Sequence, residues 1–460
     1  MIMDWADITT TAVVLDFETD TEDFGSPVNM SNDIVLACWS VVSLDTGRII
    51  KRSHKFGGAL EQEELARDIV RNGSMVVAHH AKFELGWMRR MGFRLEEVSP
   101  FCTMVAERVL QGNRLVGLTL EEVAQRELGE GKESWVSKLI KGGVPVREIP
   151  KSPLLKYCRV DVDLTLRLFI KQLHQLRTRG LNPVMHTRMR ACRMLSDVEF
   201  NGMALDADMV REEKANQEQA LVHLSMEMDK ITGGINTRST KQVAKFVFKD
   251  LGFKIPERTT LGKPDDEFPD GRPSCSEEVL EKLVAKTARQ KRFIELKRQL
   301  AKVQARLSKS LNAFEQCIVD AEANKAVPVL HFNYNQHVAA THRLSSSGRK
   351  YKVQGQNIPR EYKKMFCARK DGNKIAEADL GKLEFVIAAF LSQDPVAILE
   401  VSSGFDVHRY TAAIIKRAAS YPEEDIARTM EEAIQLMPSV TDNERTDAKP
   451  DTFGPLTIAA

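Results

Sequence analysis

The chain has 460 residues, of which 43% are hydrophobic and 28% are charged. This length and apolar content exclude a disordered chain and predict several packed units rather than one core. Lysine and arginine (66) nearly balance aspartate and glutamate (64), so the net charge indicates no class of partner. Seven scattered cysteines without a C-x-x-C pair favour neither a disulfide framework nor a zinc site, and they fit a reducing cytoplasm. No stretch approaches the roughly 20 apolar residues of a membrane span, so we expect no membrane partner.

The first part of the chain mixes strand and helix patterns. Ala12 to Leu15 and Ile34 to Val42 are apolar runs rich in β-branched residues, which predicts two strands. Ser152 to Leu176 has apolar residues at helical spacing. Together these patterns predict an α/β domain over residues 1–185.

The pattern from Met185 to Glu322 is almost entirely helical. Thr259 to Ser276 is rich in Gly, Pro and Asp and predicts a long loop within it. Ser239 followed by Gln242 predicts a capping box at the start of one helix.

Two stretches of the chain are strongly basic. Arg289 to Lys309 has helical spacing, and on its own it fits a solvated helix face as well as a binding surface. Arg343 to Lys370 interleaves cations with three aromatic residues, a composition suited to phosphate contacts.

Two carboxylates stand at the end of the first predicted strand. Asp16 and Glu18 are two residues apart, so both side chains project from the same face. Apolar neighbours make such a pair costly unless metal ions or protons compensate the charge. Taken alone, this pattern also fits a solvated strand end.

Two further clusters complete a recognisable set. His79 to Glu84 follows downstream, and Tyr157 and Asp161 share one face of the predicted helix. Together the three segments resemble the motifs of the DEDDy 3′–5′ exonucleases, in the same order. The resemblance implies a ribonuclease H-like domain, a mixed sheet with flanking helices.

The resemblance also implies how the site works. Four carboxylates would bind two Mg²⁺ or Mn²⁺ ions, which repel each other and need anionic oxygens to hold them beside the phosphate. His80 and Glu84 stand where that family has Asn and Asp, and the longer glutamate predicts a weakened exonuclease. The implied metal ligands are Asp16, Glu18, Glu84 and Asp161, and Tyr157 would position the attacking water.

The next motifs resemble family A DNA polymerases of the polymerase I type. Thr341 to Ser346 (T-H-R-L-S-S) and Gln356 to Arg360 (Q-N-I-P-R) are similar to the family's T-G-R-L-S-S and Q-N-I-P-R. His342 replaces the family's glycine, which leaves the turn geometry open. In that family these segments hold the primer–template, so the implied DNA-binding residues are Arg343, Gln356, Asn357 and Arg360.

Three later segments resemble the palm and fingers of that family. Lys374 to Glu384 is similar to motif A, which implies a strand that ends at a metal-binding Asp379. Phe405 to His408, with Thr411 and Ala412, is similar to the D-x-H-x-x-T-A segment of the fingers. Motif B would align two cations and a ring on one helical face, with a kink at Pro450. The implied nucleotide-binding residues are Glu384, His408, Arg445, Lys449 and Phe453.

The resemblance implies an exonuclease domain (1–185), a mainly helical thumb (186–330), the start of an α+β palm (331–400) and truncated fingers (401–460). Motif C is missing, and Asp379 alone cannot hold two ions, so we expect polymerisation, and dNTP binding, only with a second chain. Two alternatives remain open: a stand-alone exonuclease and a non-enzymatic DNA-binding remnant. The expected partners are primer–template DNA and single-stranded 3′ ends, in the cytoplasm of a bacterial or phage-infected cell.

Overall fold

The computed structural model describes residues 10–72, 75–131, 135–256, 259–370 and 372–448. The chain divides into two compact units, Met1–Lys374 and Ile375–Ala460, and each is described by itself. Within the described ranges, no helix combines the length and the apolar character that a bilayer crossing requires.

A five-stranded mixed sheet forms the centre of the first unit, in the order β3-β2-β1-β4-β5. β1 pairs antiparallel with β2 and parallel with β4, while β2–β3 is antiparallel and β4–β5 parallel. β1 and β2 confirm the two predicted strands. The strands are β1 (Thr11–Thr19), β2 (Ile34–Ser43), β3 (Ile49–Phe56), β4 (Met75–Ala78) and β5 (Ser99–Cys102).

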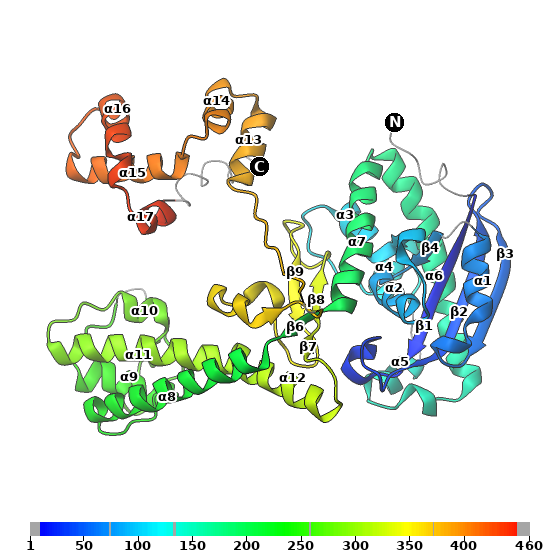
Figure 1. Cartoon of the computed structure of the whole chain (residues 1–460), viewed down its shortest axis with the longest axis horizontal. Coiled ribbons are helices and arrows are strands. Elements are labelled where there is room, and N and C mark those ends of the chain that lie inside the picture. The colour runs from blue at the N-terminus through cyan, green and yellow to red at the C-terminus, as the bar shows by residue number, and fades with distance from the viewer. Residues whose placement is uncertain (1–9, 73–74, 132–134, 257–258, 371, 449–460) are drawn as a thin grey trace. The chain divides into compact units, whose positions relative to one another are not determined.

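Helices flank this sheet and confirm the predicted α/β class (Figure 1). The long helix α6 packs along β1, β2 and β4, and α7 packs against β5. The rings of Phe101 and Phe169, 4.8 Å apart, join β5 to α6 in the core. The α-helices are α1 (Glu63–Arg71), α2 (Ala81–Arg90), α3 (Thr103–Gln111), α4 (Leu120–Leu128), α5 (Trp135–Lys141), α6 (Lys151–Thr178) and α7 (Asn182–Asn201), and short 3-10 turns cover Glu22–Gly25, Ala59–Glu61, Leu95–Glu97 and Val146–Glu148.

The following segment is mainly helical, as its sequence predicts. Helices α8 and α11 run side by side and share a core around Met228, Phe246 and Phe293 (Figure 1). The predicted loop over residues 259–276 contains neither helix nor strand. The helices are α8 (Ala207–Thr232), α9 (Thr240–Lys245), a π-helical turn (Phe246–Asp250), α10 (Glu277–Glu281), α11 (Ala288–Arg306), a second π-helical turn (Leu307–Leu311) and α12 (Asn312–Ala323).

Two sequence predictions for this segment are changed in detail. The Ser239 hydroxyl accepts the Gln242 backbone N–H, but the Gln242 side chain accepts from Asn236 instead of returning to Ser239, so the capping box is half formed. Three of the cations of α11 are paired with carboxylates, so this part of the basic stretch fits a solvated face. The pairs are Arg292–Glu227, Arg298–Glu281 and Arg306–Glu361.

Two small sheets complete the first unit. β6 lies between β10 and β7, and β8 forms a separate hairpin with β9. Their core includes Phe314, Phe332 and Tyr362. The strands are β6 (Met203–Leu205), β7 (Val329–Leu330), β8 (Phe332–Asn335), β9 (Ser345–Gly348) and β10 (Phe366–Cys367), and 3-10 turns cover Gly355–Asn357 and Arg360–Met365.

The second unit is helical where it is described. Its small core contains Ala412, Ala413, Ala433 and Val440. The prediction of a strand that ends at Asp379 is wrong, because residues 374–379 form neither helix nor strand and are exposed. The helices are α13 (Leu383–Ser392), α14 (Pro395–Ser403), α15 (Val407–Ser420), α16 (Ile426–Leu436), a 3-10 turn (Met437–Ser439) and α17 (Asp442–Asp447).

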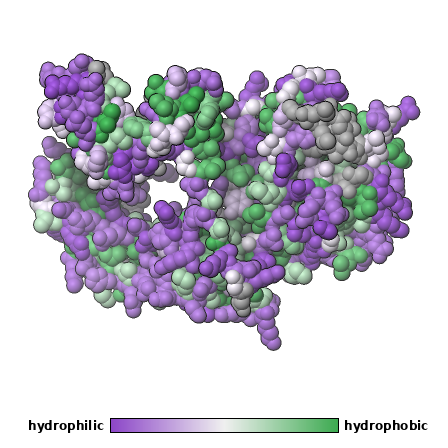
Figure 2. All heavy atoms as spheres, turned by 45° about the horizontal axis from the view of Figure 1, so that its top comes forward, coloured by the Kyte–Doolittle hydropathy of each residue, from purple (hydrophilic) through white to green (hydrophobic). Residues whose placement is uncertain are grey.

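Apolar side chains on α13 and α14 are exposed to an unusual degree. Green, hydrophobic atoms gather where these helices lie (Figure 2). A monomeric soluble domain seldom leaves such a surface open. The exposed side chains are Leu383, Ile387, Phe390, Leu391, Val396 and Leu399.

Candidate active site

The first two acidic residues of the candidate site lie on β1. Asp16 and Glu18 project from the same face of this strand, which is held between β2 and β4. Glu18 is 9% exposed and Asp16 is partly exposed. Because the strand is central in the sheet, most of its residues are buried, and the two carboxylates lie near its carboxyl end.

A thiol that the sequence did not single out completes this cluster. Cys158 on α6 is fully buried, and its Sγ lies 3.5 Å from Oδ2 of Asp16. One potential ligand atom from each of Asp16, Glu18 and Cys158 lies within 4.8 Å of the other two. The sequence signal that could have identified Cys158 is its position, because it falls between Tyr157 and Asp161 in the third motif.

Glu84, in the first turn of α2, is not a member of this group but lies close enough to Asp16 to sense its charge. It is 4% exposed, and its Oε2 is buried without a hydrogen-bond partner among the described residues. Burial, and next the negative charge of Asp16, raise the pKa of Glu84 well above its usual value. Such a carboxyl group is suited to a cation, which would compensate its charge.

Tyr157 and Asp161 lie one turn apart on α6, as predicted. Asp161 is 6% exposed, and Tyr157 is half-buried against the core beneath the sheet. Helix α6 packs against β1 and β4. The same helix contains Cys158, whose Sγ lies beside Asp16.

Removing the charge of Glu84 should change stability in a pH-dependent way. The folded-state pKa of Glu84 is raised above the unfolded value of 4.5. Without metal, Glu84 therefore does not lower the free energy of unfolding below pH 4.5, but it lowers it increasingly as the pH rises above that value. We expect Glu84→Gln to increase the free energy of unfolding at neutral pH in EDTA, but not at acidic pH, as measured by urea denaturation. Glu63→Gln, on the exposed face of α1, is the control and should show no such difference.

His80, at the position of the family's Asn, is neutral at neutral pH. Burial, and next the charge of Lys82, lower the pKa of His80 to about 3. Its ring lies edge-on to that of His337, with the centroids 6.2 Å apart. His80 therefore brings no positive charge to the cluster, in contrast to a protonated imidazole.

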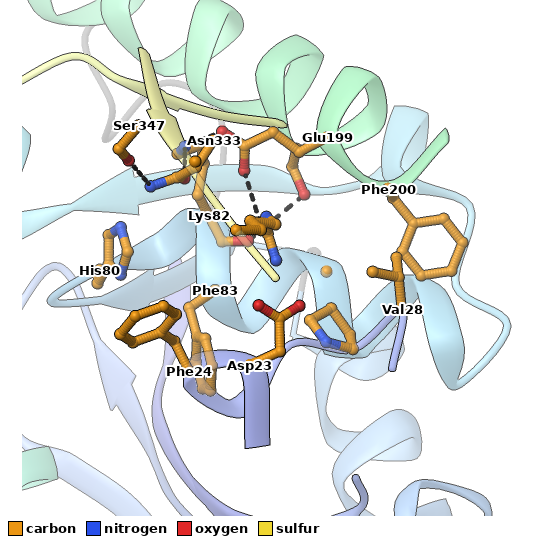
Figure 3. A pocket seen from close by; sticks show the side chains of 15 residues that line it. Asp23, Phe24, Val28, His80, Lys82, Phe83, Glu199, Phe200, Asn333 and Ser347 are labelled. Atoms are coloured by element: carbon orange, nitrogen blue, oxygen red, sulfur yellow. Dashed lines mark hydrogen bonds and ion pairs between the residues drawn. The ribbon is translucent and has the colours of Figure 1, made fainter. Parts of the chain in front are cut away.

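A pocket of about 390 Å³ lies beside α2, and a buried ion cluster forms one wall (Figure 3). Lys82 pairs with Glu199 of α7, and its Nζ also donates to the Tyr334 carbonyl oxygen at 2.6 Å. Arg349, after β9, donates to Glu199 at 3.3 Å and to Ser26 at 2.7 Å. This cluster ties the sheet region to the β8–β9 hairpin, a link that sequence spacing did not indicate.

The two segments predicted to contact DNA lie together. The Gln356 backbone N–H donates to Ser346 Oγ and its side-chain amide to the Leu344 carbonyl, both at 3.2 Å. The Asn357 amide donates to Gln354. Arg343 and Arg360 are exposed. The exposed cations and amides thus lie on two segments that hydrogen bonds hold together, and their side chains face solvent.

His342 adopts the conformation that a glycine would provide. Its φ is +58°, in the left-handed region. Its Nε2 lies 3.1 Å from the Gly112 carbonyl oxygen, and the Arg188 guanidinium donates to the His342 carbonyl oxygen at 3.0 Å. The structure therefore gives His342 a left-handed backbone, and contacts with Gly112 and Arg188 hold it.

In the second unit, three predicted residues line one open pocket of about 560 Å³: Asp379, Glu384 and His408. Arg445 is not free for a triphosphate, because its Nε lies 2.8 Å from Oδ2 of Asp406. Burial raises the pKa of Asp406, but the hydrogen bonds from Arg445 and the Arg409 backbone, together with the charges of Arg445 and Lys382, lower it overall. The predicted common helical face is not tested, since α17 ends at Asp447, and Lys449 and Phe453 lie outside the described residues.

Two family models match the chain. That of "DNA polymerase family A" covers residues 207–454, and that of "3'-5' exonuclease" covers residues 42–177. The first is centred on the helical segment and small sheets, and the second includes Glu84, Tyr157, Cys158 and Asp161.

Curated relatives agree with these models. DNA polymerase I of Borreliella burgdorferi is 26% identical over 74% of this chain and 35% of that protein. DNA polymerase I of Chloroflexus aurantiacus is 28% identical over 73% of this chain and 34% of that protein. The chain thus spans about a third of the length of these relatives.

A solved structure has the same fold. The polymerase domain of Pol1 from M. smegmatis, in complex with DNA primer-template and dNTP, superposes with a TM-score of 0.66 at 20% identity, over 96% of this chain and 67% of that one. With the first family model matching more than half of the residues, the chain belongs to DNA polymerase family A.

Proposed function

We propose that the chain is a replication protein whose first unit removes nucleotides from the 3′ end of DNA, as a proofreading exonuclease does. The observation that supports this most is the group formed by Asp16, Glu18 and Cys158, together with the buried Glu84, whose Oε2 has no hydrogen-bond partner among the described residues and whose carboxyl group senses the charge of Asp16. Placing carboxylates close together among buried apolar residues costs free energy, and bound metal ions would offset this cost.

The donor set fits divalent cations. Asp16, Glu18, Glu84 and Asp161 would hold two Mg²⁺ or Mn²⁺ ions, since carboxylate oxygens are the ligands that these hard ions prefer. Bound cations of this kind stabilise charge on the phosphate and lower the pKa of a bound water. Tyr157 lies one turn from Asp161 on α6, and its hydroxyl would orient the attacking water.

The raised pKa of Glu84 bears on the rate of this reaction. Without a cation, burial and the charge of Asp16 shift the pKa of the Glu84 carboxyl group toward its protonated form, which is a poorer metal ligand than the carboxylate. Metal binding must therefore displace a proton from Glu84. This cost supports the expectation of a weakened exonuclease, and it predicts that metal binding strengthens as pH rises.

We propose the following domain assignment: exonuclease (1–185), thumb (186–330), start of the palm (331–400) and start of the fingers (401–460). Arg343, Gln356, Asn357 and Arg360 would hold the primer–template backbone, because their outer faces are open. Asp379 would bind metal and Glu384 and His408 would face a dNTP, since all three line one pocket. Arg445, Lys449 and Phe453 would complete the dNTP site, which requires Arg445 to leave Asp406.

The exposed apolar side chains of α13 and α14 suggest where further palm and fingers polypeptide packs. We propose a second chain as the source, acting with this one in the cytoplasm, where the seven free cysteines would stay reduced. Template-directed extension by the purified chain alone would argue against such a partner.

The exonuclease is tested with a 5′-labelled single strand, incubated with the chain and Mg²⁺ or Mn²⁺. We expect a ladder of products shortened from the 3′ end, and no products in EDTA. A strand with a nuclease-resistant 3′-terminal linkage is the control and should stay intact. Shortening that persists in EDTA, or that ignores the 3′ linkage, would contradict the proposal.

A further inference from the structure

The thiol of Cys158 occupies a position that a metal ligand would take. Its Sγ lies 3.5 Å from Oδ2 of Asp16, and it belongs with Asp16 and Glu18 to a group whose ligand atoms all lie within 4.8 Å. Cys158 is fully buried, so its sulfur faces this group and not solvent. A cation bound between the two carboxylates would be within reach of the sulfur.

A second observation points to a cation at this place. Glu84 is 4% exposed, and its Oε2 has no hydrogen-bond partner among the described residues. It comes from α2, a different element from β1 and α6, and it is close enough to Asp16 to feel its charge. A buried carboxylate oxygen with no donor is accounted for if it completes a metal site.

Sulfur changes which cations such a site prefers. Mg²⁺ selects oxygen ligands, whereas Zn²⁺ and Co²⁺ accept thiolate together with carboxylate. We propose that Cys158 is a metal ligand with Asp16 and Glu18, so that this site takes a thiophilic divalent cation of the Zn²⁺ class more tightly than Mg²⁺. On binding, the thiol loses its proton to solvent. The inference deepens the proposed exonuclease site and rests on it for the identity of the carboxylate ligands.

Cys38 provides a matched control. It lies on β2 opposite Asp16 in the strand register, is 1% exposed and contacts Cys158 through its thiol. It is therefore a buried thiol in the same surroundings, but it is not a member of the group with Asp16 and Glu18. Cys38→Ser and Cys158→Ser remove the same atom at two neighbouring positions.

The test is to titrate Co²⁺ into the reduced, metal-free chain and record absorption in the near ultraviolet, where thiolate-to-Co²⁺ charge transfer occurs. We expect the band in the wild type and in Cys38→Ser, and its loss in Cys158→Ser with Co²⁺ binding weakened at least about tenfold, since even outer-shell changes cost that much. Zn²⁺ should abolish the band and Mg²⁺ should not. A band that survives in Cys158→Ser would overturn the assignment.

A second measurement needs no variant. X-ray absorption of the wild type loaded with one equivalent of Zn²⁺ should show a sulfur neighbour at about 2.3 Å. A shell of oxygen and nitrogen alone would overturn the assignment even if Cys158→Ser failed to fold. Neither measurement includes DNA, so the two proposals fail separately. Sulfur ligation without DNA cleavage would sink the exonuclease alone, and Mg²⁺-dependent cleavage without sulfur ligation would sink the Cys158 assignment alone.

Discussion

Asp16→Asn is expected to lower the rate of 3′-nucleotide removal by on the order of 10²–10³-fold. Asp16 is the residue around which the group is built, since Glu18, Glu84 and Cys158 all interact with or lie beside it. Asparagine keeps the shape but removes the charge, so any cation held there would be weakened and displaced. A displacement of about 1 Å in a catalytic group is enough for a loss of that size.

The measurement is the initial rate of shortening of a 5′-labelled single strand at saturating Mn²⁺. Asp163→Asn is the matched control, because Asp163 lies on the same helix as Asp161 but forms an ion pair with Arg52 at the surface. It should leave the rate unchanged. Thermal unfolding should show that Asp16→Asn is folded, with a midpoint no lower than the wild type in EDTA, because the variant removes a negative charge beside the buried Glu18 and Glu84. An unchanged rate in Asp16→Asn would place the chemistry elsewhere.

Much of the first unit could be predicted from local pattern. β1, β2 and α6 follow from apolar runs and helical spacing, which report which face of an element is buried. The left-handed backbone at His342 also matches the glycine that the family has there. Such features depend on a few consecutive residues, and so a sequence carries them directly.

Other features depend on partners far away in the chain and could not be predicted in this way. Lys82 and Glu199 are 117 positions apart, and no periodicity relates them. The sulfur of Cys158 becomes a candidate ligand only because α6 packs on β1. The segment before Asp379 has a strand-like sequence, but a strand is defined by a hydrogen-bonded neighbour, and none is described beside residues 374–379.

The buried ion cluster beside the pocket leads to the second large prediction. Lys82 and Glu199 have side chains that are 6% and 5% exposed, and Glu199 also accepts from Arg349 and from the Tyr334 backbone N–H. Glu199→Gln leaves the buried Lys82 without its carboxylate partner and removes one partner of Arg349, whose side chain is 19% exposed. We expect a loss of about 3–5 kcal/mol in the free energy of unfolding. Lys82→Met should cost less, since Arg349 still pairs with Glu199.

Urea denaturation followed by tryptophan fluorescence measures this effect, because Trp39 and Trp87 are buried in the core of the first unit. Glu130→Gln breaks the exposed Arg167–Glu130 pair and should leave stability nearly unchanged. The double variant Lys82→Met with Glu199→Leu removes both charges, and we expect it to be more stable than Glu199→Gln alone. A loss below about 1 kcal/mol for Glu199→Gln would show that solvent reaches the cluster.

The same cluster connects elements that carry different proposed tasks. Lys82 is two residues from Glu84 on α2, whereas Arg349 follows the β8–β9 hairpin that precedes the Gln356 segment. If Glu199→Gln loosens this connection, amide exchange should rise in α7 and in the hairpin, while β1 to β3 stay protected. A uniform rise across the sheet would instead mean that the cluster stabilises the whole unit and not this junction.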